Sequence, residues 1–152
     1  EIHGLQALAA VANQIRKLLV AKDFTESPGG AAWHPAAAYP QFQKSVMPAV
    51  VAFDRELVGR IGAWETTLAG DPAEEKKRKK SDKAATDLQL ARNPGNPFPV
   101  YQTLKKADRF SRAELLRALE ALAEADVRLK SSALNPRLIL ERVVWQICSP
   151  NT

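Results

Sequence analysis

The alternation of hydrophobic and polar positions is clearest in residues 111–148, where it predicts two helices joined by a short polar turn. Ser111 and Glu114 have the spacing of a capping box, in which each side chain accepts a hydrogen bond from a free backbone N–H at a helix start. Asn135 before Pro136 predicts a second start, an N-cap residue followed by proline at the first helical position. The first helix is expected to carry an apolar stripe made of Leu115, Leu116, Leu119, Leu122 and Ala123.

The last helix is apolar over a wider arc than one neighbouring helix covers. This arc has two explanations. It is the centre of the domain's own bundle, or part of it packs against another protein. The second explanation predicts an interface made of Leu138, Ile139, Val143, Val144, Trp145 and Ile147.

A third helix is expected over residues 46–68, where apolar residues recur every three or four positions. Gly59 and Gly62 lie off this stripe, and they either allow another backbone to come close or are simply tolerated. The stripe consists of Val46, Val50, Phe53, Leu57, Ile61, Trp64 and Leu68.

The rest of the chain also indicates helices and loops. Residues 4–22 have one apolar face, and a short helix is expected between the break at 93–97 and Asp108. Residues 31–40 are rich in alanine and proline and are expected to form an irregular loop. Because no stretch alternates with a period of two, the predicted fold is all-α, a bundle of about five to six helices.

Residues 74–93 are polar almost all round and include a basic run. The favoured interpretation is a solvated helix face, since aromatic residues for base stacking are absent from it. The alternative is weak contact with the phosphates of DNA. The basic residues concerned are Lys76, Lys77, Arg78, Lys79, Lys80 and Lys83.

Composition favours a single globular domain over residues 1–152, with 45% hydrophobic and 26% charged residues and a net charge of +5. No apolar run approaches the roughly 18 residues of a membrane span, so no membrane partner is expected. The single cysteine, Cys148, excludes an intrachain disulfide and suits a reducing, cytoplasmic compartment. It is expected to pack at a helix end and not to act as a nucleophile.

Enzyme chemistry is disfavoured. No phosphate-binding glycine loop is present, and His3 and His34 have no ligand spacing around them, so neither a cofactor nor a metal is predicted. Asp126 falls at a seven-residue spacing from Leu119 and is expected to form a structural ion pair with Lys130, four residues on. The alternative partners for this carboxylate are Arg137 and Arg142 of the last helix.

Several short segments occur in an order that is specific in combination. They are QIRKLL at 14–19, NPF at 96–98, LKSS at 129–132 and NPRLILER at 135–142. With their surroundings, residues 4–24 and 96–148, they resemble the C-terminal domain of the delta subunit of bacterial DNA polymerase III, a clamp-loader component.

The resemblance implies a non-catalytic helical collar, whose helices pack against other clamp-loader subunits and close a pentameric ring. It also implies that the sliding-clamp contact and the AAA+-like modules belong to an N-terminal region, and that polymerase activity resides in another subunit of the holoenzyme. Because the chain opens on Glu1 in helical sequence, we expect it to be the C-terminal piece of a larger protein. Residues 25–92 are longer than the family's connection there and are expected to be an insertion. The rival hypothesis is a nucleic-acid-binding module that uses residues 76–83.

Overall fold

The computed structural model describes residues 4–68 and 87–149, and within these ranges the chain forms helices and loops and no strand, as predicted. Five of the helices have ten or more residues. The elements are α1 (Gly4–Glu26), the 3-10 helix η1 (Pro28–Ala32), α2 (Tyr39–Gln41), the π-helical turn η2 (Phe42–Val46), α3 (Met47–Leu68), α5 (Phe98–Ala107), α6 (Arg112–Ser131) and α7 (Pro136–Cys148).

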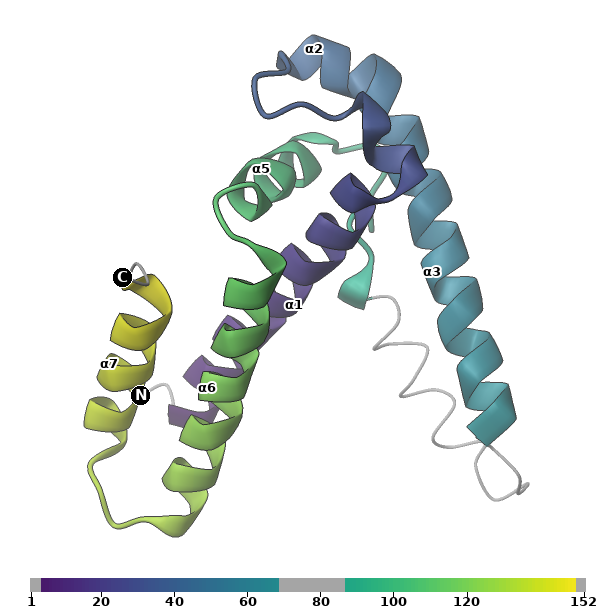
Figure 1. Cartoon of the computed structure of the whole chain (residues 1–152). Helices are drawn as coiled ribbons and strands as arrows, with labels where there is room; N and C mark the ends of the chain where they lie inside the picture. Colours follow the sequence, from purple (N-terminus) through teal and green to yellow (C-terminus); the bar gives the residue numbers. More distant parts are fainter. Residues whose placement is uncertain (1–3, 69–86, 150–152) are drawn as a thin grey trace.

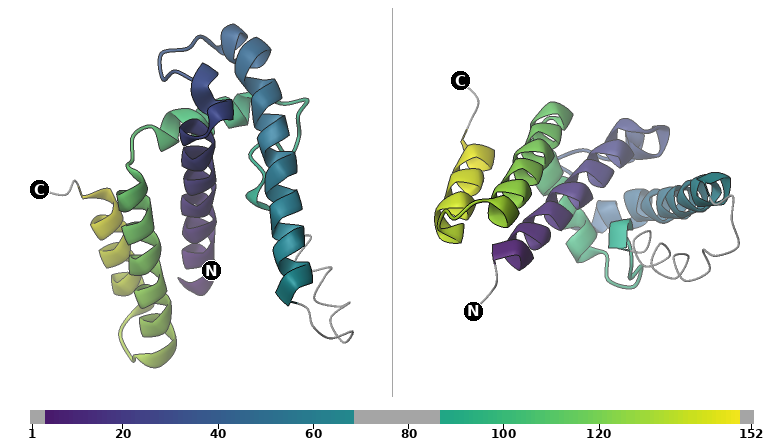
Figure 2. Two further views of the ribbon diagram at one scale, coloured as in Figure 1. Left: turned by 45° about the vertical axis from the view of Figure 1, so that its right-hand side comes forward. Right: turned by 90° about the horizontal axis from the view of Figure 1, so that it is seen from below.

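The long helices lie side by side in an order that differs from their order in the sequence. Seen from below in Figure 2, α7, α6, α1 and α3 follow one another across the molecule. Figure 1 shows α6 and α7 as an antiparallel pair, with η2 and α5 near the top, where α1 and α3 approach each other. The helix α7 therefore lies at one edge of the molecule and α3 at the other.

Two hydrophobic clusters hold this arrangement together. The first joins the end of α1 to η2, the start of α3 and α5, and Phe24, Phe42 and Leu104 are fully buried in it. The second joins the N-terminal part of α1 to α6 and α7. Leu18 of α1 packs against both clusters, so α1 connects the two halves of the core.

Both predicted helix starts are confirmed. The Glu114 N–H donates to Ser111 Oγ at 3.2 Å, and the Ser111 N–H donates to a Glu114 carboxylate oxygen at 2.7 Å. The hydrogen bonds that the Ser111 backbone N–H and hydroxyl donate to the Glu114 carboxylate lower its pKa. At the start of α7, Asn135 Oδ1 accepts from the Arg137 N–H at 3.0 Å.

The apolar stripe predicted for α6 was partly wrong. Leu116 is 48% exposed and Ala123 is also exposed, whereas Leu115 and Leu122 are buried as expected. The remaining buried positions of this helix are alanines, namely Ala118, Ala121 and Ala125. Because α6 packs against α1 on one side and α7 on the other, small side chains that allow close helix approach are buried in preference to some larger ones.

The stripe predicted for α3 describes the helix correctly but overstates its burial. Val46 and Val50, at the upper end, are fully buried, whereas Trp64 is 73% and Leu68 84% exposed. Among the described residues, no atom lies within 4 Å of a Cβ built at Gly59 or Gly62. The apolar spacing therefore identified one face of α3 correctly. Only the N-terminal part of that face packs against the rest of the described chain.

One charged side chain is buried in the described structure. Asp54 of α3 is 3% exposed and accepts hydrogen bonds from the backbone N–H groups of Leu90 (2.9 Å) and Ala91 (2.7 Å). Burial raises the pKa of this carboxyl, and the hydrogen bonds from Ala91 and Leu90 oppose that rise. The carboxylate thereby attaches the chain before α5 to the side of α3.

Replacing Asp54 by alanine should lower the free energy of unfolding by about 2 kcal/mol, because two poorly solvated N–H groups lose their acceptor. Asp54→Asn should cost less, since the amide keeps one acceptor oxygen and buries no charge. Urea unfolding followed by circular dichroism measures both values. Equal losses for the two variants would show that the hydrogen bonds do not account for the effect.

Among the described glycines, Gly30 has the closest contact with the backbone of another element. A Cβ at this position would lie 2.2 Å from the Phe24 carbonyl oxygen and 2.7 Å from Thr25 Cα, both backbone atoms of α1. Only glycine fits there without moving the helix. Its neighbour Gly29 has ordinary space, with the nearest atom 3.7 Å from a built Cβ.

Gly30→Ala should therefore destabilise the protein by about 3 kcal/mol, because η1 must move away from α1 to relieve the overlap. Gly29→Ala is the matched control and should change the free energy of unfolding by less than about 1 kcal/mol. Thermal unfolding of both variants tests the comparison. If Gly30→Ala is as stable as the control, the close contact between Gly30 and the backbone of α1 does not contribute to stability.

Candidate subunit interface

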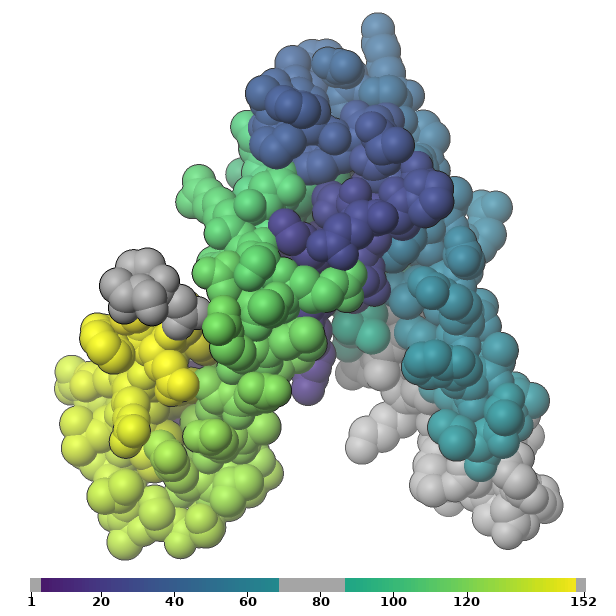
Figure 3. All heavy atoms as spheres, viewed as in Figure 1, coloured from purple at the N-terminus to yellow at the C-terminus, as the bar shows by residue number. Residues whose placement is uncertain are grey.

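The helix α7 has one covered and one uncovered side. Among the described elements it packs against α6 and, less extensively, against α1. At about 100° per residue, Ile139, Val143 and Ile147 share the side that faces α6. Figure 3 shows the atoms of α7, in yellow, along one edge of the molecule beside those of α6.

The six predicted interface residues divide between these two sides. Ile139 (6% exposed) and Val143 (4%) are buried in the second cluster, and Ile147 is half-buried against it. Ile139 and Val143 hold α7 to its own domain and do not present a free surface, so the interface predicted for these two residues is corrected. Ile147 packs against the same cluster but keeps part of its surface exposed. The wide apolar arc arises because α7 is hydrophobic both toward the core and away from it.

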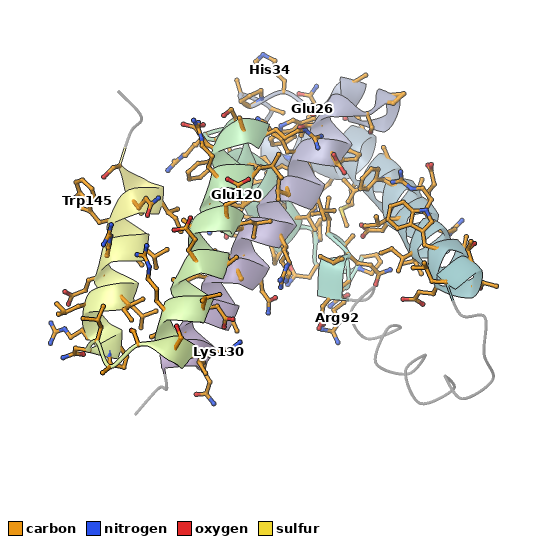
Figure 4. The ribbon with its side chains drawn as sticks, turned by 60° about the horizontal axis from the view of Figure 1, so that its bottom comes forward. Glu26, His34, Arg92, Glu120, Lys130 and Trp145 are labelled. Atoms are coloured by element: carbon orange, nitrogen blue, oxygen red, sulfur yellow. The ribbon has the colours of Figure 1, made fainter. Side chains whose placement is uncertain are left out.

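The other three residues form what we call the α7 outer face: Leu138 (59% exposed), Val144 (46%) and Trp145 (73%). In Figure 4, the Trp145 side chain extends from α7 away from α6. An ion pair lies on the same side of the helix, with Arg137 Nε 2.7 Å from Glu141 Oε1. The face thus combines an exposed indole ring, two aliphatic side chains and a paired charge.

Three more exposed apolar residues lie on α6 and on the turn before α7, where sequence reasoning proposed no surface. The sequence shows that these residues are hydrophobic. It does not show that they are exposed, because exposure depends on how α6 packs. They are Leu116 (48% exposed), Val127 (61%) and Leu134 (61%).

Asp126 and Lys130 lie at the surface of α6. Lys130 Nζ is 2.5 Å from Asp126 Oδ2. The Lys130 side chain is 59% exposed and the Asp126 side chain 39%. Arg137, one of the alternative partners, pairs with Glu141 instead. Such an exposed pair contributes little to stability. Asp126 itself is partly exposed and lies next to the buried Ala125.

A group of ion pairs that the sequence did not predict joins α6 to α1. Arg112, the first residue of α6, pairs with Asp23 and with Glu26 at the end of α1, the latter at 2.7 Å. The hydrogen bonds from Glu26 and Asp23 raise the pKa of the guanidinium. The contact joins the start of α6 to the end of α1, although its exposure limits its energy.

The other sequence-predicted residues do not come together in a reactive site. His34 is exposed in the loop after η1, where its Nδ1 accepts a hydrogen bond from the Ala36 N–H. Cys148 is exposed and not packed, contrary to expectation. His3 and the basic residues Lys76, Lys77, Arg78, Lys79, Lys80 and Lys83 lie outside the described residues.

The described part of the chain offers neither a metal site nor a membrane span. Within residues 4–68 and 87–149, no three histidine, cysteine, aspartate or glutamate side chains are grouped so that they could hold a metal ion. No helix in these ranges has the length and hydrophobicity needed to cross a bilayer.

The described part of the chain is all-helical and leaves the α7 outer face exposed. Comparison with known families specifies it further. Residues 75–147 match the model of the DNA polymerase III delta subunit, C-terminal domain, and over this range the chain resembles that family, as predicted from its short segments. No curated protein and no solved structure matches the chain.

The matched range contains α5, α6 and α7, and hence the whole α7 outer face. It starts at residue 75, inside the stretch 25–92 predicted as an insertion, and it leaves out residues 4–24, which the resemblance had included. The division of the chain into one domain with an insertion stays a prediction.

Proposed function

We propose that this chain is the collar domain of a clamp-loader delta subunit, and that it works by holding subunits of the DNA polymerase III complex together. The observation that carries this proposal is the position of the α7 outer face. It lies on an edge helix, opposite the domain's own core, within the segment that resembles the delta family.

The chemistry of the face suits a permanent protein contact. Trp145 is 73% exposed, and tryptophan is among the residues that dominate binding energy when a partner buries them. Leu138 lies about two turns before it on the same side of α7, and the adjacent Val144 is also exposed, so both would extend the apolar surface. The Arg137–Glu141 pair lies among these residues, since Glu141 is three positions after Leu138 and four before Trp145, and it would contribute to specificity more than to affinity.

This role requires no chemistry in the fragment itself. The proposal places polymerase activity in another subunit, and the sliding-clamp contact and AAA+-like modules in an N-terminal region of the longer protein. Its partners are the other clamp-loader subunits, and its compartment is the cytoplasm.

The α7 outer face can be tested with Trp145→Glu, in the chain co-expressed with the other clamp-loader subunits. A buried charge in place of a buried indole should weaken the complex by about 30-fold or more, since central aromatic residues contribute about 2 kcal/mol or more. Co-purification at low and high salt measures the loss, and circular dichroism checks that the variant is folded.

The matched control is Trp64→Glu. Trp64 is also 73% exposed, but it lies on α3, at the opposite edge of the molecule. The control should leave the complex intact. If both variants co-purify normally, the proposal fails, and the basic segment from Lys76 to Lys83 should then be tested for salt-sensitive binding to DNA.

A further inference from the structure

The described surface contains a cavity of about 280 Å³ that is separate from the exposed apolar residues of the α7 outer face. It lies where the C-terminal end of α7 meets the N-terminal half of α6, two segments that run side by side in Figure 1. Its apolar lining includes Leu115, Ala118 and Ala121 of α6, with Ile15 of α1 and Ile147 of α7. The volume is close to the lower limit for a ligand site and suits one inserted side chain.

The two alanines explain why space remains here. Ala118 and Ala121 are buried on the side of α6 that lines the cavity, and their side chains end at Cβ. Phe110, before α6, and Ile147, near the end of α7, are half-buried members of the same cluster and form apolar walls. The cavity is thus a hydrophobic gap in the second cluster that opens to solvent.

The rim of the cavity is positively charged. Arg109 and Arg117 both line it and are exposed, and neither has a carboxylate within salt-bridge distance among the described residues. The one carboxylate in the lining, Glu114, accepts hydrogen bonds from the Ser111 backbone N–H and hydroxyl. These hydrogen bonds lower the pKa of Glu114 and keep it ionised, so the lining carries two positive charges and one negative charge, a net charge of +1.

We propose that this cavity binds an acidic segment of a partner protein, which inserts one apolar side chain between α6 and α7 and places its carboxylates beside Arg109 and Arg117. The apolar lining accounts for the inserted side chain, and the two arginines select flanking carboxylates by charge complementarity. The proposal concerns a different surface from the collar contact and does not depend on it.

A short peptide with both ends blocked, acetyl-Glu-Phe-Glu-amide, tests the proposal by NMR titration of the ¹⁵N-labelled chain. Saturable shifts are expected at the amides of Ala118, Ala121 and Ile147, where the phenyl ring would add a ring-current effect. Acetyl-Gln-Phe-Gln-amide lacks the carboxylates and should bind about fivefold more weakly. Acetyl-Glu-Ala-Glu-amide lacks the apolar side chain and should give no saturable shift.

The double variant Arg109→Gln with Arg117→Gln should reduce binding of the acidic peptide about fivefold, to the level of the glutamine peptide. The matched control is Arg55→Gln with Arg60→Gln, which makes the same change of charge on α3 and should leave binding unchanged. Equal binding of the two phenylalanine peptides, an unchanged affinity in the Arg109 and Arg117 variant, or shifts confined to Leu138, Val144 and Trp145 would overturn the proposal.

Discussion

The packing of α1 against both hydrophobic clusters is the contact on which the rest of the structure depends. Its C-terminal half is buried with η2, α3 and α5, and its N-terminal half with α6 and α7. Leu18 contacts both groups, and Phe24 is completely buried at the end of the helix. Since hydrophobic burial supplies most of the stabilising free energy, loss of α1 would separate the two halves and leave the α6–α7 pair without its support.

The position of α7 follows from this arrangement and explains why one side of this helix is exposed. Ile139 and Val143 are buried against α6 and anchor α7 to the domain. Once they are anchored, the opposite side of the helix, with Leu138 and Trp145, must face outward. The same geometry leaves the cavity at the end of α7, because alanines line α6 there. Stability and the proposed recognition therefore share one helix but use different sides of it.

Local signals in the chain were reliable for helix starts and unreliable for burial. Ser111 and Asn135 marked the starts of α6 and α7 because a cap depends on only a few neighbouring residues. Leu116 was expected inside and is 48% exposed, whereas Ala121, which hydrophobicity did not single out, is buried. The cap is a local interaction, but burial depends on which helices come to lie alongside, and this information is distributed over the whole chain.

The sequence alone was sufficient for the all-α fold, for the helix starts at Ser111 and Asn135, and for the family that residues 75–147 resemble. Only the tertiary structure separated the apolar arc of α7 into an anchoring side and an outer face. Hydrophobic periodicity reports that a residue prefers to leave water, and does not say whether the surface that covers it belongs to the same chain. Packing against α6 covers one side of α7 and leaves Trp145, on the other side, exposed.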